Sequence, residues 1–166
     1  LGGMCVKGNT FFYVNPMSSD GKNDFNKGSG AVRHEWFGTA CCPSNVSRFL
    51  PSMPAYMYAT QDNALVINLF GDSKADITLP GTPVQITQQT QYPWQGNIRI
   101  TIDPQKSSAF PLHIRIPGWA NGQAIPGDLY SYEDKLAKPI GLTINGKKSD
   151  AVIENGYLKL NRNWKK

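Results

Sequence analysis

The sequence has 166 residues, a length that suits one domain or slightly more. Its 16 glycines and 12 prolines favour a β-rich or mixed architecture with many turns over a helix bundle. The formal charge of +5 comes from 17 basic and 12 acidic residues scattered along the chain, which indicates a mildly basic surface and no nucleic-acid interface. No apolar run is long enough to span a membrane. Three cysteines neither make a disulfide framework nor indicate a compartment, so a periplasmic or secreted location stays open.

The N-terminal residues read as a hairpin followed by a loop. Gly3–Val6 and Thr10–Val14 are short β-type runs joined by a tight turn. Cys5 lies in the first run, and we expect it to be a small core side chain because cysteine is among the most buried residue types. Ser18–Val32 is polar and Gly-rich and lacks the spacing of a calcium-binding loop. Since the chain begins at Leu1 and both ends fall within strand-like runs, we expect a piece of a longer protein.

Two adjacent cysteines, Cys41 and Cys42, are the strongest chemical signal in the chain. Pro43 suits the first turn of a helix, where free N–H groups and the helix dipole favour a thiolate. A disulfide between neighbours is strained, whereas zinc accepts thiolate ligands readily. The pair is therefore metal-bound or reactive, or else it is two small buried side chains at a helix entrance. His34 and Glu35 are nearby acid–base or ligand candidates, although adjacent residues point in different directions.

A helix-like rhythm of apolar residues follows over Ser44–Ala59. Pro51 and Pro54 interrupt it, and each removes a backbone donor, so we expect a kinked helix or two short pieces.

From Asp62 onward the pattern is that of an antiparallel β-sandwich, with one face of each sheet buried. The expected strands lie within residues 65–70, 76–79, 84–90, 98–102, 112–116, 140–145, 151–153 and 157–160. His113 alternates with apolar neighbours and should face outward. Four aromatic residues are possible sugar platforms, but core or edge packing is the preferred interpretation for each of them: Trp94, Trp119, Tyr130 and Trp164.

Several segments together resemble the C-terminal part of glycoside hydrolase family 127, the β-L-arabinofuranosidases. They occur in the family's order and span nearly the whole chain: Phe11–Pro16, Trp36–Asn45, Ile116–Ala120, Gly156–Leu158 and Trp164. The Cys-Cys-Pro-x-Asn element within them is the most specific part.

The resemblance implies a mainly β fold, with a hairpin and short helix that end an (α/α)6 barrel. Residues 1–60 would be the C-terminal remnant of the catalytic barrel, and residues 61–166 a β-sandwich. It also implies a retaining hydrolase in which Cys41 is the nucleophile and Cys41 and Cys42 bind zinc. Tyr13 resembles a family residue near the bound sugar.

The family's other zinc ligands, a glutamate and a cysteine, and its glutamate acid/base lie upstream of the matched region. Cys5 and Glu35 do not fall on those positions. We therefore expect Zn2+ in the intact parent, no tight zinc binding by this chain alone, and no activity without the missing N-terminal barrel. The expected substrate is an arabinose-containing or related plant-type glycan. The alternative is a non-catalytic carbohydrate-binding or structural β-sandwich module.

Overall fold

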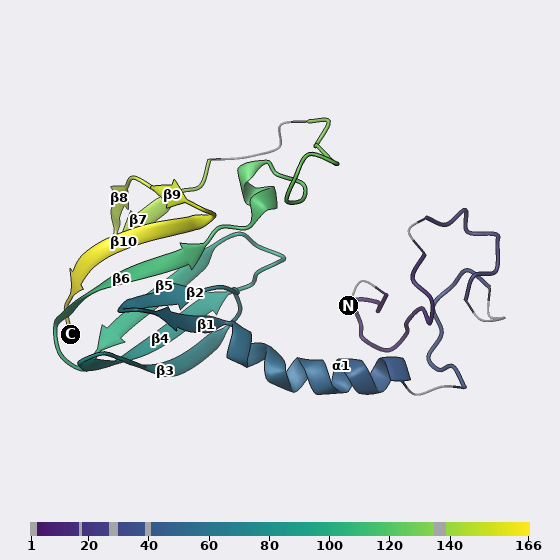
Figure 1. Cartoon of the computed structure of the whole chain (residues 1–166), viewed down its shortest axis with the longest axis horizontal. Coiled ribbons are helices and arrows are strands. Elements are labelled where there is room, and N and C mark those ends of the chain that lie inside the picture. The colour runs from purple at the N-terminus through teal and green to yellow at the C-terminus, as the bar shows by residue number, and fades with distance from the viewer. Residues whose placement is uncertain (1–2, 17, 27–29, 39–40, 135–138) are drawn as a thin grey trace. The chain divides into compact units, whose positions relative to one another are not determined.

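The structure is a computed structural model that describes residues 3–16, 18–26, 30–38, 41–134 and 139–166. It divides into two compact units, Leu1–Met53 and Pro54–Lys166, which are described separately. Figure 1 shows the elements of each unit along the chain.

In the N-terminal unit the expected hairpin is present, but as single bridges and not as extended strands. Met4 pairs with Phe11, and the Cys5 amide donates a 2.9 Å hydrogen bond to the carbonyl oxygen of Thr10. Phe11 also pairs with His34, which joins the hairpin to the segment that leads into the helix. The expectation that Cys5 is a core residue is wrong, because it is only half-buried at the hairpin turn.

The helical stretch falls into two pieces, as its prolines predicted. Helix α1 (Cys41–Ser52) carries Pro51 in its last turn, and the 3-10 helix η1 (Met53–Tyr56) follows with Pro54. A proline near the end of a helix removes a single backbone hydrogen bond, so the chain continues in a tighter turn instead of extending the α-helix. No helix in the described ranges is both long enough and apolar enough to cross a membrane.

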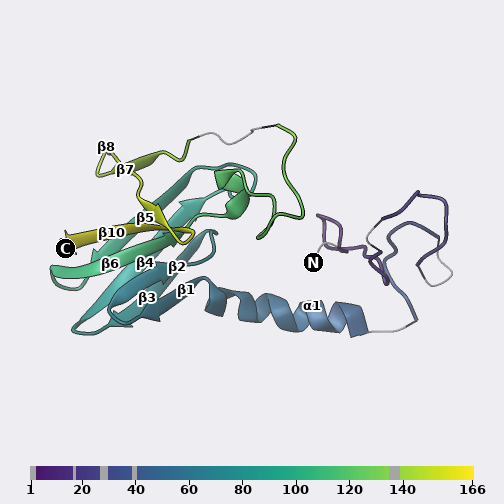
Figure 2. The same cartoon turned by 45° about the horizontal axis from the view of Figure 1, so that its top comes forward.

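The C-terminal unit is built from ten strands among the described residues. They are β1 (Tyr58–Gln61), β2 (Ala64–Ile67), β3 (Ser73–Leu79), β4 (Thr82–Thr90), β5 (Ile98–Pro104), β6 (Ser108–Arg115), β7 (Leu142–Ile144), β8 (Lys147–Ser149), β9 (Ile153–Glu154) and β10 (Tyr157–Trp164). They form a five-stranded sheet in the order β1-β2-β6-β10-β9, a three-stranded sheet in the order β3-β4-β5, and the hairpin β7-β8. Figures 1 and 2 show the two larger sheets as facing layers.

The core lies between these two sheets, so the sandwich is confirmed. Along β3, β4 and β6 its fully buried members alternate with more exposed residues, as in a half-buried antiparallel sheet, whereas all four residues of β2 are buried. They are Leu65, Ile67, Leu79, Val84, Ile86, Phe110 and Leu112. At one end of the core, the side chain of Gln88 from β4 donates to the Tyr58 hydroxyl of β1 at 2.9 Å, which joins the two sheets by a buried polar contact.

Three features of the fold differ from the sequence prediction. Strands β1 and β8 were not expected, because their residues are mostly exposed and carry no apolar alternation. The strand expected over residues 65–70 ends at Ile67. In addition, β2 pairs with β6 in parallel, Leu65 opposite Leu112, while the remaining pairings between described strands are antiparallel.

Candidate functional site

The cysteine pair lies in the first turn of α1, where the sequence placed it. Cys41 is the first residue of the helix and is exposed, so the alternative of a buried small side chain is wrong for Cys41. The Ser44 hydroxyl donates a 3.0 Å hydrogen bond to the Cys41 carbonyl oxygen, which tightens this turn. Cys42 is the second helical residue, while Thr39 and Ala40, which precede the pair in the motif, lie outside the described residues.

Tyr13 belongs to an aromatic cluster in the same N-terminal unit. The N-terminal aromatic cluster, as we call it, comprises Phe11, Tyr13, His34 and Phe37, with Phe37 at its centre. The Phe37 ring lies 5.1 Å from the Phe11 ring, 5.7 Å from that of Tyr13 and 5.8 Å from that of His34. Phe37 is 5% exposed, so it anchors the segment that runs toward α1. The half-buried Tyr13 ring is thereby fixed against this segment.

The backbone at Tyr13 is held by Asn26, a residue that sequence analysis missed. Asn26 is completely buried, and its Oδ1 accepts a 2.8 Å hydrogen bond from the Tyr13 amide. Its Nδ2 donates to the Val32 carbonyl oxygen, also at 2.8 Å, so both ends of the amide are satisfied. A buried amide that lost these partners would cost about 1–3 kcal/mol. Because Asn26 lies in a polar, Gly-rich loop, nothing in its sequence context distinguishes it from its exposed neighbours.

The two acid–base candidates beside the cysteines have different environments. His34 pairs with Phe11 through both backbone groups, at 2.9 and 3.0 Å, and its ring packs edge-on against Phe37. It therefore has a packing role in the N-terminal aromatic cluster. Glu35, by contrast, is exposed.

Metal binding requires more donors than these contacts bring together. Among the described residues, no three His, Cys, Asp or Glu side chains form a group that could hold an ion. Structural and catalytic zinc sites use three or four protein ligands.

Cys5 has an unusual thiol for a residue at a hairpin turn. Hydrogen bonds from Thr10, led by that of its side chain, lower the pKa of the Cys5 thiol from an ordinary value of 9.0 to about 6. The Sγ atom also donates to Asn9 Oδ1 at 3.2 Å, and an ionised sulfur would require that amide to rotate and present its NH2 group. Whether it is protonated or ionised, the Cys5 sulfur lies within a small polar turn.

On the sandwich, three of the four aromatic residues are more exposed than predicted. Trp94 is 75% exposed, Tyr130 61% and Trp119 53%, although Trp119 stacks on Tyr92 at 6.2 Å between ring centroids. Trp164 packs as expected, since its ring stacks on Phe110 and its Nε1 donates to the Phe110 carbonyl oxygen at 2.9 Å.

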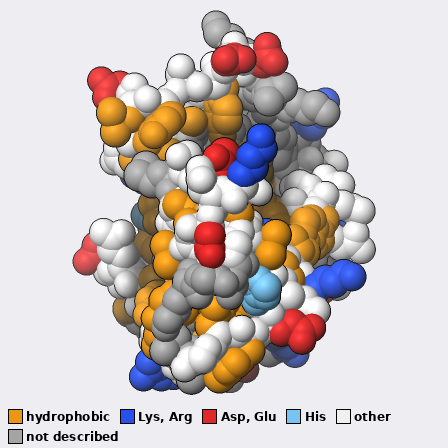
Figure 3. Space-filling model, turned by 90° about the vertical axis from the view of Figure 1, so that its right-hand side faces the viewer, with side chains coloured by type: hydrophobic (Ala, Val, Ile, Leu, Met, Phe, Trp, Pro, Cys, Tyr) orange, Lys and Arg blue, Asp and Glu red, His pale blue; other side chains and the backbone are white. Residues whose placement is uncertain are grey.

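The positive side chains that are visible on one face of the molecule are separated from one another. On the face drawn in Figure 3, Lys and Arg side chains lie apart from one another among hydrophobic and neutral polar groups. His113 lies on the outer face of its sheet, as predicted, with its ring 6.5 Å from that of Tyr157.

Two family models match this chain in succession. The model for the catalytic domain of β-L-arabinofuranosidase of glycoside hydrolase family 127 matches residues 1–55, and the model for the middle domain of the same family matches residues 64–166. Together they account for both the cysteine-containing unit and the sandwich.

Individual relatives agree with these models. A non-reducing end β-L-arabinofuranosidase of Bifidobacterium longum subsp. longum is 28% identical over 96% of this chain. A solved β-arabinofuranosidase of the family is 42% identical over 98% of the chain, with a TM-score of 0.81, and a β-L-arabinofuranosidase from Geobacillus stearothermophilus T6 is 34% identical over 98%, with a TM-score of 0.76. The chain spans about a quarter of their length: 23% of the Bifidobacterium protein and 24% of each solved chain.

Proposed function

Since the chain belongs to glycoside hydrolase family 127, we propose that it forms part of a retaining glycoside hydrolase with Cys41 as its nucleophile. The observation that carries this proposal is the pair of consecutive cysteines in the first turn of α1, within the residues that the catalytic-domain model matches. The exposed position of Cys41 supports it, because a nucleophile must reach its substrate.

In this reaction the Cys41 sulfur attacks the anomeric carbon of the sugar. A carbon–sulfur bond forms while the bond from that carbon to the leaving oxygen breaks, and a general acid elsewhere in the longer polypeptide protonates the leaving group. Water then attacks the same carbon and gives a proton to the former general acid, which now acts as a base. The sulfur leaves as thiolate, and the second inversion restores the original configuration. The N–H groups of the first helical turn support this step because they stabilise the thiolate.

We propose that Cys41 and Cys42 supply two ligands to Zn2+ in the longer protein. Two thiolates fit the donor chemistry of zinc, and we propose that its remaining ligands come from elsewhere in the longer polypeptide. When bound, zinc keeps a coordinated thiol deprotonated at neutral pH.

Tyr13 is proposed to line the sugar site. Its support is the rigid setting described above, in which Asn26 fixes its backbone and Phe37 fixes its ring. A side chain that contacts a substrate must be held in place before the substrate arrives. The proposed substrate is a glycan with terminal β-L-arabinofuranose, the sugar that the names of the relatives specify.

The barrel assignment is also a proposal. Residues 1–60 would be the end of an (α/α)6 barrel whose other helices lie in the rest of the polypeptide. Phe49 and Leu50 of α1 support this, because they are 42% and 51% exposed and a barrel helix buries such side chains against its neighbours.

The test uses the full gene product and the hydrolysis of p-nitrophenyl β-L-arabinofuranoside. Cys41→Ser should reduce kcat by at least about a thousandfold, because an oxygen nucleophile at this position is neither ionised nor as nucleophilic. Metal analysis should find about one zinc per chain in the wild type. Cys5→Ser is the matched control, since Cys5 lies outside the proposed site, and it should leave kcat unchanged.

Retention of activity by Cys41→Ser would exclude sulfur as the attacking atom. Absence of both hydrolysis and zinc would favour the alternative of a carbohydrate-binding sandwich. In that alternative the exposed Trp94 and Trp119 would form the sugar-binding surface, because aromatic faces stack on sugar rings. Binding of arabinan by the isolated chain, lost in Trp119→Ala, would then be the expected result.

A further inference from the structure

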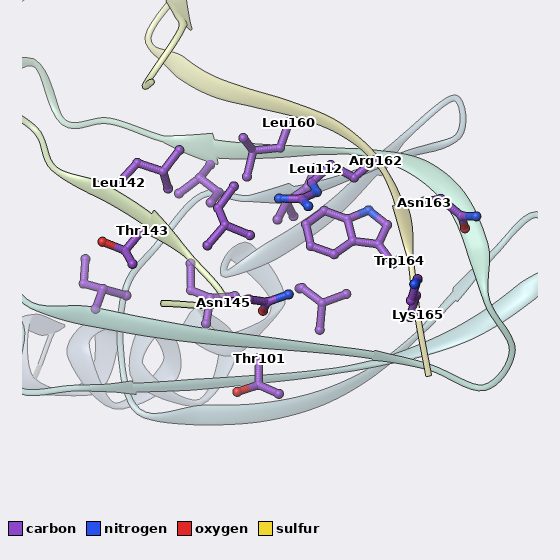
Figure 4. Close-up of a pocket in the computed structure, with 15 residues that line it drawn as sticks. Thr101, Leu112, Leu142, Thr143, Asn145, Leu160, Arg162, Asn163, Trp164 and Lys165 are labelled. Carbon is purple, nitrogen blue, oxygen red and sulfur yellow. The ribbon is translucent and has the colours of Figure 1, made fainter. Parts of the chain in front are cut away.

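The sandwich of the C-terminal unit has an open groove between its two sheets, lined by both apolar and polar side chains. The groove has a volume of about 500 Å3, and Figure 4 shows side chains from both layers projecting into it. Strands β5, β6, β7 and β10 all contribute to its walls. The apolar lining includes Ile100, Ile102, Ile114, Leu142, Ile144 and Leu160. These side chains are half-buried, whereas the equivalent positions deeper in the core are fully buried.

Two strand edges without partners border this groove. Strand β5 is the last strand of the three-stranded sheet, so among the described strands only β4 pairs with it. Among the described strands, β7 pairs only with β8, so its other edge is open as well. An open edge presents a row of backbone N–H and C=O groups that can pair with another strand. Here two open edges border a groove whose apolar side chains come from both sheets.

We propose that the groove receives one β-strand from elsewhere in the longer polypeptide, paired with the edge of β5. Its inward residues are branched and apolar, alternating with polar ones, because the groove wall offers isoleucine and leucine side chains at the spacing of a strand. The charged residues of the lining are Arg162 and Lys165, both basic, so the strand carries an acidic residue at that end. This inference is independent of the cysteine chemistry proposed above.

The source of the strand follows from the size of the relatives and the shape of the groove. This chain spans only about a quarter of their length, so a longer polypeptide has ample sequence to supply a strand. A second copy of this chain fits less well. Its described strands already belong to folded sheets, whereas the proposed occupant is a single strand that has no partner before it docks.

The experiment is hydrogen–deuterium exchange on the full gene product, read at residues 98–102 of β5. If a strand is docked, every amide in this segment has a partner on one side or the other. All of them should then exchange at least about a hundredfold more slowly than in an unstructured chain. The protection should not change on dilution. If alternate amides exchange at nearly the unstructured rate, as they do on a bare edge, the proposal is wrong.

A pair of variants separates docking from general stability. Ile100→Asp places a charge in the groove and should release the outward amides of β5, while Arg99→Asp, an exposed neighbour on the same strand, should not. Exchange in β4, which is paired on both sides, reports whether each variant still folds; if Ile100→Asp unfolds, Ile100→Ala replaces it. Protection that disappears on dilution together with a dimer would assign the groove to a second copy and overturn the proposed source.

Discussion

Replacement of Tyr58 by phenylalanine should weaken the connection between the two sheets by a measurable amount. The Tyr58 hydroxyl lies 2.8 Å from Ser73 Oγ and accepts a 2.9 Å hydrogen bond from Gln88 Nε2. Removing the oxygen deletes both bonds, worth about 0.5–1.5 kcal/mol each, or roughly 1–3 kcal/mol together. The cost should fall in the upper half of this range. Gln88 is only 1% exposed, and its Nε2 would keep only the weaker 3.2 Å bond to the Leu69 carbonyl oxygen.

The assay is urea unfolding of Tyr58→Phe beside a matched control, Tyr56→Phe. Tyr56 lies two residues earlier and is 60% exposed, so its hydroxyl loss should cost less than about 0.5 kcal/mol. A loss of about 2 kcal/mol in Tyr58→Phe should lower the midpoint without changing the m-value, and should lower Tm by about 8 °C. If the two variants unfold within about 0.5 kcal/mol of each other, the buried network between β1, β3 and β4 does not form, and the reasoning fails.

Two further predictions test the core and the thiol at the hairpin. Leu65→Ala, at a fully buried position, should cost about 3–5 kcal/mol of unfolding free energy, whereas Leu129→Ala, 82% exposed, should cost under about 0.5 kcal/mol; equal urea midpoints would contradict the sandwich core. The pKa of Cys5 is lowered to about 6, so its alkylation by iodoacetamide, followed by peptide mass spectrometry, should show half-maximal rate near pH 6 in the folded chain and near pH 9 in urea. Because the folded pKa is depressed, the stabilisation from this group is complete above the unfolded pKa and is lost as the pH falls through 6; a folded midpoint near 9 would refute the role of Thr10.

Much of the sandwich could be predicted because its strands alternate in sequence. Residues 98–102 and 112–116 both follow the rule that one face of a strand is buried, and the structure places their apolar residues inward. Strand β8 (Lys147–Ser149) could not be found this way, since all three residues are exposed. Periodicity identifies the buried face of a strand but not its neighbour, so the pairing of β2 with β6 was not accessible from the sequence.

The candidate site shows the same division between local and long-range information. The cysteines at the start of a helix were predicted, because Pro43 and the polar residues after it are local signals. The support of Tyr13 by Asn26 depends on a contact across a Gly-rich loop, and a buried asparagine has no local signature there. The exposure of Trp94 and Trp119 was also missed, since composition favours burial of large aromatic residues and cannot indicate which of them stays at the surface.

The parallel pairing of β2 and β6 has a consequence for how the chain reaches its native state. Leu65 pairs with Leu112, and β3, β4 and β5 all lie between them in the sequence. This contact therefore closes a long loop. Closing this loop costs conformational entropy before the contact stabilises the fold. Domains dominated by such distant pairings fold over milliseconds to seconds. The three-stranded meander, with its local hairpins, is therefore expected to form early, and the five-stranded layer to assemble upon it in the slower step.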